Sequence, residues 1–291
     1  MGSLQEAFLR ELREYKGSAE NTVRSYRTAL EQFGGFLGEY NIKEVDESEI
    51  KEWMMSLSRR GMKATTINLK LTALKQYFDW LYITGKIDDN PIKTIQNLRV
   101  SEARVKYLNE RQVSLLISEI RDDICQHRFR NLAIVKIMLS TGCRINVIHN
   151  LNRNDIDLEN KTIQFYNRKS RKEMKMPLSD ASWRAYSNYL ELEKDKRHTS
   201  AFNSQKTNRI STSAVRDMVK KYLKRVVDNP DLQSCHCLRH SAAMTLALNG
   251  VPARTIKKFL GHTSIQNTMI YINALDEEVN EAVDILNGYL K

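Results

Sequence analysis

The stretch of the chain from Cys235 to Ala274 constrains the protein more than any other feature, because it places chemically active side chains at short, fixed spacings. It reads CHCLRHSAAMTLALNGVPARTIKKFLGHTSIQNTMIYINA and contains His236, Arg239, His262 and Tyr271. A guanidinium stabilises negative charge on the non-bridging oxygens of a phosphodiester. A tyrosine hydroxyl has a pKa of about 10, so it needs neighbouring groups to become a nucleophile at neutral pH. The set therefore indicates chemistry on a phosphodiester.

The order of these motifs resembles the C-terminal signature of the tyrosine recombinases. That signature is His-x-Leu-Arg-His, then Leu-Gly-His some twenty residues later, then a tyrosine; here the matching stretches are residues 236–240, residues 260–262 and Tyr271. The resemblance implies a further arginine shortly after a helix that ends in Thr-Gly. Residues 132–142, LAIVKIMLSTG, predict an apolar helix with its glycine as C-cap, and Arg144 follows.

The resemblance also implies a catalytic lysine on a β-hairpin. Two short runs at residues 161–166 and 173–178 predict that hairpin, with NRKSRK between them. Counting back from Pro177 aligns Lys169 with the family's lysine. Lys172 is the alternative, because the usual Gly-Lys-Gly is here Arg-Lys-Ser.

The match has a second departure after Arg144. The family commonly has an acidic residue three positions on that supports the site, and this chain has Val147 there. Asp155 is a candidate to compensate for the missing carboxylate.

The first ninety residues predict a small α-helical bundle, because apolar residues recur every three or four positions. The segments NTVRSYRTALEQFGGFL and KATTINLKLTALKQYFDWL resemble the core-binding domain of the same family. Polar and basic side chains near the starts of these two helices suit contacts to phosphates and base edges. The predicted DNA-binding residues here are Arg24, Ser25, Arg27, Lys63, Thr65, Thr66, Asn68 and Lys70, joined further along by Lys172, Arg216 and Lys220.

The predicted fold is mainly α with a small β-hairpin or sheet, in two domains that the resemblance implies close on DNA as a C-shaped clamp. Residues 1–96 form the helical core-binding domain, the polar and basic residues 97–106 a linker, and residues 107–275 the catalytic domain. Residues 276–291 predict an amphipathic helix. Such a helix packs on its own domain or, as the resemblance implies, docks into a neighbouring protomer.

Bulk properties agree with a DNA-binding protein that acts in the cytoplasm. The net charge of +11 over 291 residues favours a polyanionic partner. The four cysteines show neither a secreted disulfide framework nor zinc-ribbon spacing, and we expect reduced thiols and no metal. No signal peptide or long apolar run predicts a membrane partner. A phosphate-binding glycine loop is also lacking, so we expect no cofactor.

The resemblance implies a site-specific DNA recombinase. Tyr271 would form a 3′-phosphotyrosyl bond, Arg144 and Arg239 would hold the phosphate, and Lys169 would protonate the leaving oxygen. His236 and His262 would assist proton transfer and hydrogen bonding. A monomer or dimer would assemble as a homotetramer on two DNA sites, with a possible accessory protein, and exchange strands through a Holliday junction. The chain's size is similar to the Xer and transposon-resolvase members. A type IB topoisomerase and a non-catalytic architectural DNA-binding protein are the alternatives.

Overall fold

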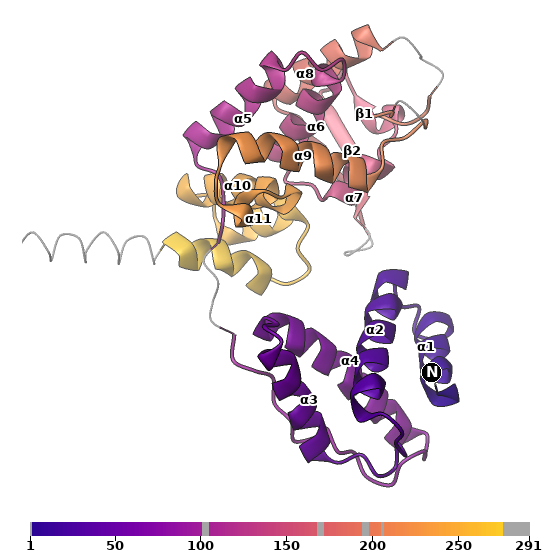
Figure 1. Cartoon of the computed structure of the whole chain (residues 1–291). Coiled ribbons are helices and arrows are strands. Elements are labelled where there is room, and N and C mark those ends of the chain that lie inside the picture. The colour runs from indigo at the N-terminus through magenta and orange to yellow at the C-terminus, as the bar shows by residue number, and fades with distance from the viewer. Residues whose placement is uncertain (1, 101–104, 168–171, 194–197, 205–206, 276–291) are drawn as a thin grey trace, which may run out of the picture. The chain divides into compact units, whose positions relative to one another are not determined.

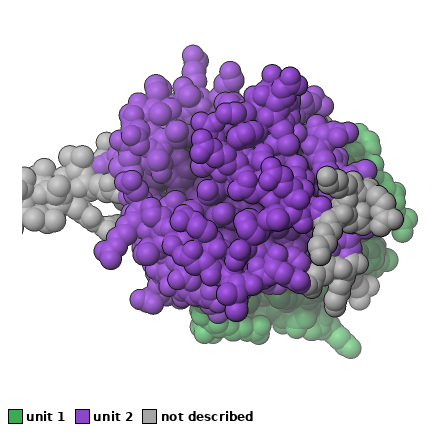
Figure 2. Space-filling view, turned by 90° about the horizontal axis from the view of Figure 1, so that it is seen from above, with its two compact units in different colours: residues 1–103 green, residues 104–291 purple. Residues whose placement is uncertain are grey.

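The computed structural model describes residues 2–100, 105–167, 172–193, 198–204 and 207–275 (Figure 1). The chain divides into two compact units, residues 1–103 and 104–291, which Figure 2 draws in green and purple. The division falls within the stretch predicted as a linker. Both units are mainly helical, and the second contains one small sheet, so the predicted fold class is confirmed.

The first unit is a four-helix bundle around an aromatic core. Its helices are α1 (Ser3–Glu14), α2 (Glu20–Leu37), α3 (Glu47–Arg59) and α4 (Ala64–Ile83). The Phe33 ring meets Trp53 edge-on with centroids 5.2 Å apart, and both side chains are fully buried. Asp46 starts α3 with a capping box, since its carboxylate accepts the N–H groups of Ser48 and Glu49.

The second unit is built around one helix in which every residue is buried or half-buried, as expected for a helix at the centre of a domain. This helix is α6 (Arg128–Thr141), and it packs against α5 (Glu110–Asp122), α8 (Asp180–Leu192) and α10 (Cys235–Leu248). The described residues of the unit also form α7 (Ile145–Asn150), α9 (Thr212–Val226) and α11 (Ala253–Leu260), with short 3₁₀ turns at Arg153–Asp155 and Pro230–Leu232. The chain is helical again from 266 to 275.

The predicted hairpin forms the larger part of a three-stranded antiparallel sheet. Its strands are β1 (Ile156–Asp157), β2 (Thr162–Asn167) and β3 (Lys172–Pro177), in that order. Ile156 and Asp157 pair with β2 as a short edge strand that was not part of the predicted hairpin. The Trp183 ring N–H donates to the Leu158 carbonyl at 2.9 Å, which fixes the sheet to α8.

Local capping fixes the start of the helix that carries the signature histidines. α10 begins at Cys235, where the hydroxyl of Ser234 accepts the Cys237 N–H. The short helix α7 was not expected, because six residues are too few for a periodic apolar pattern. Within the described ranges, no helix is both long enough and apolar enough to cross a bilayer.

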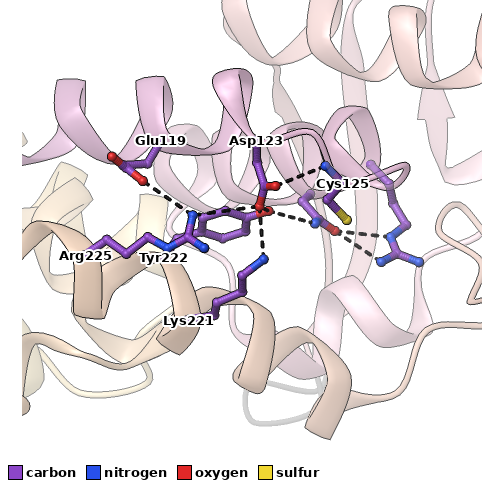
Figure 3. Close-up of polar contacts among 8 residues, drawn as sticks. Glu119, Asp123, Cys125, Lys221, Tyr222 and Arg225 are labelled. Carbon is purple, nitrogen blue, oxygen red and sulfur yellow. Dashed lines mark hydrogen bonds and ion pairs between the residues drawn. The ribbon is translucent and has the colours of Figure 1, made fainter.

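An acidic residue at the end of α5 joins three helices of the second unit (Figure 3). The carboxylate of Asp123 accepts hydrogen bonds from the Tyr222 hydroxyl at 2.7 Å and the Lys221 ammonium at 3.0 Å, both on α9. The backbone N–H of Cys125 donates to it as well, and Asn131 of α6 donates to the Tyr222 oxygen. The hydrogen bonds from Tyr222, Lys221 and the Cys125 backbone, the first of these most, lower the pKa of Asp123 to about 2.

We expect the substitution Asp123→Asn to lower the free energy of unfolding at neutral pH by about 1–3 kcal/mol, because it removes a charged acceptor of several hydrogen bonds. The pKa of Asp123 is lower in the folded chain, so its stabilisation is complete above the unfolded pKa of about 3.9 and is lost as the pH falls towards 2. Urea unfolding of wild type and variant across this range measures the difference. The exposed neighbour Asp122 supplies the matched control, Asp122→Asn. A difference that stays constant down to pH 2 would contradict the assignment.

Candidate active site

Three of the chemically active side chains lie within the first turns of α10. His236, Arg239 and His240 are three and four residues apart, so they project from neighbouring positions of one helix face. The helix packs against α6 and α11, which lie beside it in Figure 1. Ser234 caps this helix and so fixes the residue at which it begins, just before the three side chains.

Arg239 is 3% exposed and joins the C-terminal ends of two helices. Its Nη1 donates to the Gly142 carbonyl at 2.5 Å, and its Nη2 donates to the Leu260 carbonyl at 2.8 Å. A cation is favourable there because the last carbonyls of α6 and α11 carry partial negative charge. Burial, followed by the charge of Arg144, lowers the pKa of Arg239 to about 10, which leaves it charged at neutral pH.

The glycine that was predicted to end α6 is required by both its conformation and its surroundings. Gly142 has a φ of 57° in the left-handed region and forms the C-cap. A Cβ atom there would lie 2.8 Å from Cδ2 of Leu260 and 3.1 Å from the Phe259 ring. The residue therefore allows α11 to approach the end of α6, so that one guanidinium reaches both carbonyls.

Arg144 lines the same hollow as Arg239. It precedes α7 as its N-cap residue and is half-buried, and burial lowers its pKa. Among the residues that the structure describes, no hydrogen bond or ion pair occupies its guanidinium. The hollow measures about 500 Å³ and is lined by α7, the sheet and α11 as well as by the two arginines. Two guanidinium groups at one hollow form a site for an anion such as a phosphodiester.

The position where the tyrosine recombinases commonly have an acidic residue also faces this hollow. Val147 lines it, and so does Asp155, the proposed substitute. The Asp155 carboxylate accepts the backbone N–H of Asn152 at 2.7 Å, so it stabilises the turn that follows α7. Its role in holding Arg144 remains a prediction.

Tyr271 lies in the helical segment 266–275 and is 1% exposed. Its hydroxyl is 3.0 Å from Nδ1 of His240. Burial raises the pKa of Tyr271, whereas the charges of Arg239 and Arg144 lower it, so the phenol lies within the field of both arginines. The predicted nucleophile and the two predicted phosphate ligands are thus brought together from three separate segments.

The histidine that contacts Tyr271 is one to which the sequence analysis assigned no role. His240 is one turn beyond His236, and the two rings meet edge-on with centroids 4.4 Å apart. The other predicted histidine, His262, has its Nδ1 2.9 Å from the Thr268 hydroxyl. The signal for His240 was its spacing of four from His236, which places the two rings on one helix face.

Of the two lysines predicted as general acid, the structure describes only the backbone of one. Lys169 lies outside the described residues. Lys172 belongs to β3, where its backbone pairs with Asn167 of β2 at the end of the hairpin. Both lysines stay candidates for the general acid.

The predicted DNA-binding residues divide into two groups. Three already have partners within the first unit: Arg27 pairs with Glu6 of α1, Asn68 exchanges two hydrogen bonds of 2.8 Å with the Leu98 backbone, and Lys70 donates to Gln32 at 2.6 Å. The others in described positions are exposed or half-exposed; they are Arg24, Ser25, Lys63, Thr65, Thr66, Arg216 and Lys220. The second group has side chains free for DNA, whereas contacts by the first group would compete with internal bonds.

Comparisons with family models and with curated proteins agree on the family that this chain resembles. A model of the phage integrase family matches residues 106–278, and one of the phage integrase N-terminal SAM-like domain matches residues 6–85. A tyrosine recombinase of Thermosipho africanus is 27% identical over 97% of this chain and 99% of its own length. The tyrosine recombinase XerC of Thermodesulfovibrio yellowstonii is 28% identical, covering 95% and 93%.

Solved structures share the fold over nearly the whole chain. XerH site-specific recombinase bound to a palindromic difH substrate superposes with a TM-score of 0.79 at 19% identity, covering 97% of this chain and 85% of that one. The Tn1549 transposon integrase in complex with a circular intermediate DNA gives a TM-score of 0.77 at 20% identity, covering 97% and 100%.

Proposed function

The chain belongs to the phage integrase family, and from that premise we propose that it is a tyrosine recombinase that cleaves and rejoins DNA at a specific core site. The observation that carries this proposal is the convergence of Arg144 and Arg239 on one hollow, with Tyr271 in the field of both. The names of the curated relatives, which match this chain over nearly its full length, support it.

The proposed reaction is the one that the resemblance to tyrosine recombinases implies for these side chains. The Tyr271 oxygen attacks a DNA phosphorus, forming a 3′-phosphotyrosyl bond and releasing a 5′-hydroxyl. Arg144 and Arg239 stabilise the charge on the non-bridging oxygens in the transition state. Lys169, or Lys172 in its place, protonates the leaving oxygen, and His236 and His262 assist through hydrogen bonds. The phosphotyrosyl bond retains the energy of the phosphodiester, so rejoining needs no external source.

The burial of Tyr271 adds a conformational step to this reaction. Its hydroxyl has to reach a phosphorus atom held by the two arginines, yet its side chain is 1% exposed in the free chain. We therefore propose that a small shift of the segment 266–275 on DNA binding exposes the Tyr271 oxygen while its contact with His240 is kept.

Strand exchange needs more than one protomer. We propose a homotetramer on two DNA sites, formed from monomers or dimers, that exchanges strands in sequential pairs through a Holliday junction. Residues 276–291, which lie outside the described residues, are proposed to dock into a neighbouring protomer. The exposed Arg24, Lys63, Thr65 and Thr66 of the first unit contact DNA on this proposal, and an accessory protein is a further candidate partner.

Covalent trapping tests the proposal and finds the DNA site together. The full chain is incubated with fragmented genomic DNA that carries random nicks. A nick just 3′ of the cleavage point lets the short fragment with the free 5′-hydroxyl diffuse away, which blocks rejoining. Denaturation, removal of free DNA and sequencing then identify what stays attached, and mass spectrometry of the digested adduct identifies the attached residue.

A site-specific recombinase is expected to give adducts at one sequence, all carried by the peptide that contains Tyr271. Adducts scattered over many sequences would favour the topoisomerase alternative. Binding of DNA with no adduct at all would favour a non-catalytic DNA-binding protein. An adduct on a different residue would show that the assignment of the nucleophile is wrong.

A further inference from the structure

The hydrogen bond between His240 and Tyr271 gives His240 a chemical role that His236, Arg239 and His262 do not fill. A buried phenol needs an acceptor for its O–H, and the bond that the described residues provide to the Tyr271 hydroxyl is the one to His240 Nδ1, at 3.0 Å. We therefore assign the phenol as the donor and Nδ1 as the unprotonated acceptor. The ring is then the Nε2–H tautomer, with its basic nitrogen on the nucleophilic oxygen.

The surroundings of His240 keep the ring neutral before DNA binds. Burial lowers its pKa to about 4, and the nearby His236 and Arg239 contribute in the same direction. At neutral pH the imidazole therefore has a free lone pair for the phenolic proton. A bound phosphodiester brings negative charge to Arg144 and Arg239, which offsets part of this effect and raises the basicity of the ring when the reaction needs it.

The other two histidines of the site are placed differently. His262 directs its Nδ1 to the Thr268 hydroxyl, and His236 meets the His240 ring edge-on. Neither of these contacts involves the Tyr271 hydroxyl.

We propose that His240, and not His236 or His262, accepts the phenolic proton of Tyr271 as the phosphotyrosyl bond forms; this inference rests on the proposed function. The bond from Tyr271 Oη to phosphorus forms and the bond from phosphorus to the 5′-oxygen breaks. The phenolic proton moves to His240 Nδ1, and the leaving 5′-oxygen gains a proton from the lysine acid. Both transfers reverse when the strands rejoin.

The substitution His240→Asn separates proton transfer from positioning. An asparagine Oδ1 lies close to where histidine Nδ1 lies, so it still accepts the hydrogen bond from Tyr271, but an amide does not take up the proton. We expect cleavage of a nicked substrate to slow by about 10²–10⁴-fold, the usual contribution of general base catalysis, with DNA binding retained. The residual rate should rise with pH, because solvent hydroxide then has to remove the proton.

Fluorinated tyrosine at position 271 provides the decisive second measurement, because its phenol is more acidic and needs a base less. We expect it to restore cleavage in His240→Asn far more than it accelerates the wild-type chain. The matched control is His127→Asn, since His127 precedes α6 and makes no side-chain cap there. It should cleave at the wild-type rate.

Several results would overturn the inference. One is wild-type cleavage by His240→Asn; another is slow cleavage that neither higher pH nor the fluorinated tyrosine improves, which would indicate a structural role. Rescue of His236→Asn or His262→Asn in place of His240→Asn would assign the base to that residue. Failure of the proposed function looks different, because the wild-type chain itself would then form no adduct at Tyr271.

Discussion

Replacing the buried nucleophile by Tyr271→Phe is expected to abolish covalent attachment to DNA while leaving DNA binding intact. The substitution removes only the Oη atom. Among the described residues, no other hydroxyl hydrogen-bonds to His240 close to the charges of Arg239 and Arg144. It also leaves His240 Nδ1 without its donor, so we expect a loss of about 1–2 kcal/mol in the free energy of unfolding. The measurements are adduct formation on a nicked core site, DNA binding by gel shift and urea unfolding.

A second buried tyrosine provides the control for this change. Tyr186 of α8 is fully buried, and its hydroxyl has no hydrogen-bond partner among the described residues. Tyr186→Phe should therefore leave cleavage unchanged and leave stability unchanged or higher, because no bond is lost with the buried oxygen. Adducts formed by Tyr271→Phe at the wild-type level would remove Tyr271 from the reaction.

The substitution Arg144→Lys is expected to reduce cleavage by about 10²–10³-fold, comparable to the loss of an oxyanion donor. A lysine keeps the positive charge but loses the planar fork that binds two phosphate oxygens at once. Because the Arg144 guanidinium makes no bond to another described residue, the free energy of unfolding should change by less than about 1 kcal/mol. Single-turnover cleavage and urea unfolding measure the two effects separately.

Arg239 gives the contrasting case. Its guanidinium joins the Gly142 and Leu260 carbonyls, so Arg239→Lys should lower both cleavage and stability. The exposed Arg121 of α5 supplies a control that should change neither property, Arg121→Lys.

Two outcomes would contradict the prediction for Arg144. Full cleavage by Arg144→Lys would show that Arg144 does not contact the phosphate, and a large loss of stability would assign it a structural role.

The sequence by itself predicted the long helices, the C-cap of α6 and the candidate residues of the site. Periodic apolar residues predicted the long helices, and the glycine signal predicted Gly142 as the C-cap of α6. These features depend on interactions between residues a few positions apart, which the sequence displays directly. The spaced motifs also indicated Arg144, Arg239 and Tyr271 before any geometry was known.

The tertiary structure alone decided how these residues are used. It directed the Arg239 fork to two helix ends, placed His240 rather than His236 or His262 on the Tyr271 hydroxyl, and gave Asn68 and Lys70 partners within the first unit. Each of these contacts joins residues that are distant in the chain or depends on the phase of a helix relative to its neighbour. Motif spacing shows which groups belong to a site, but distances between their atoms follow from packing.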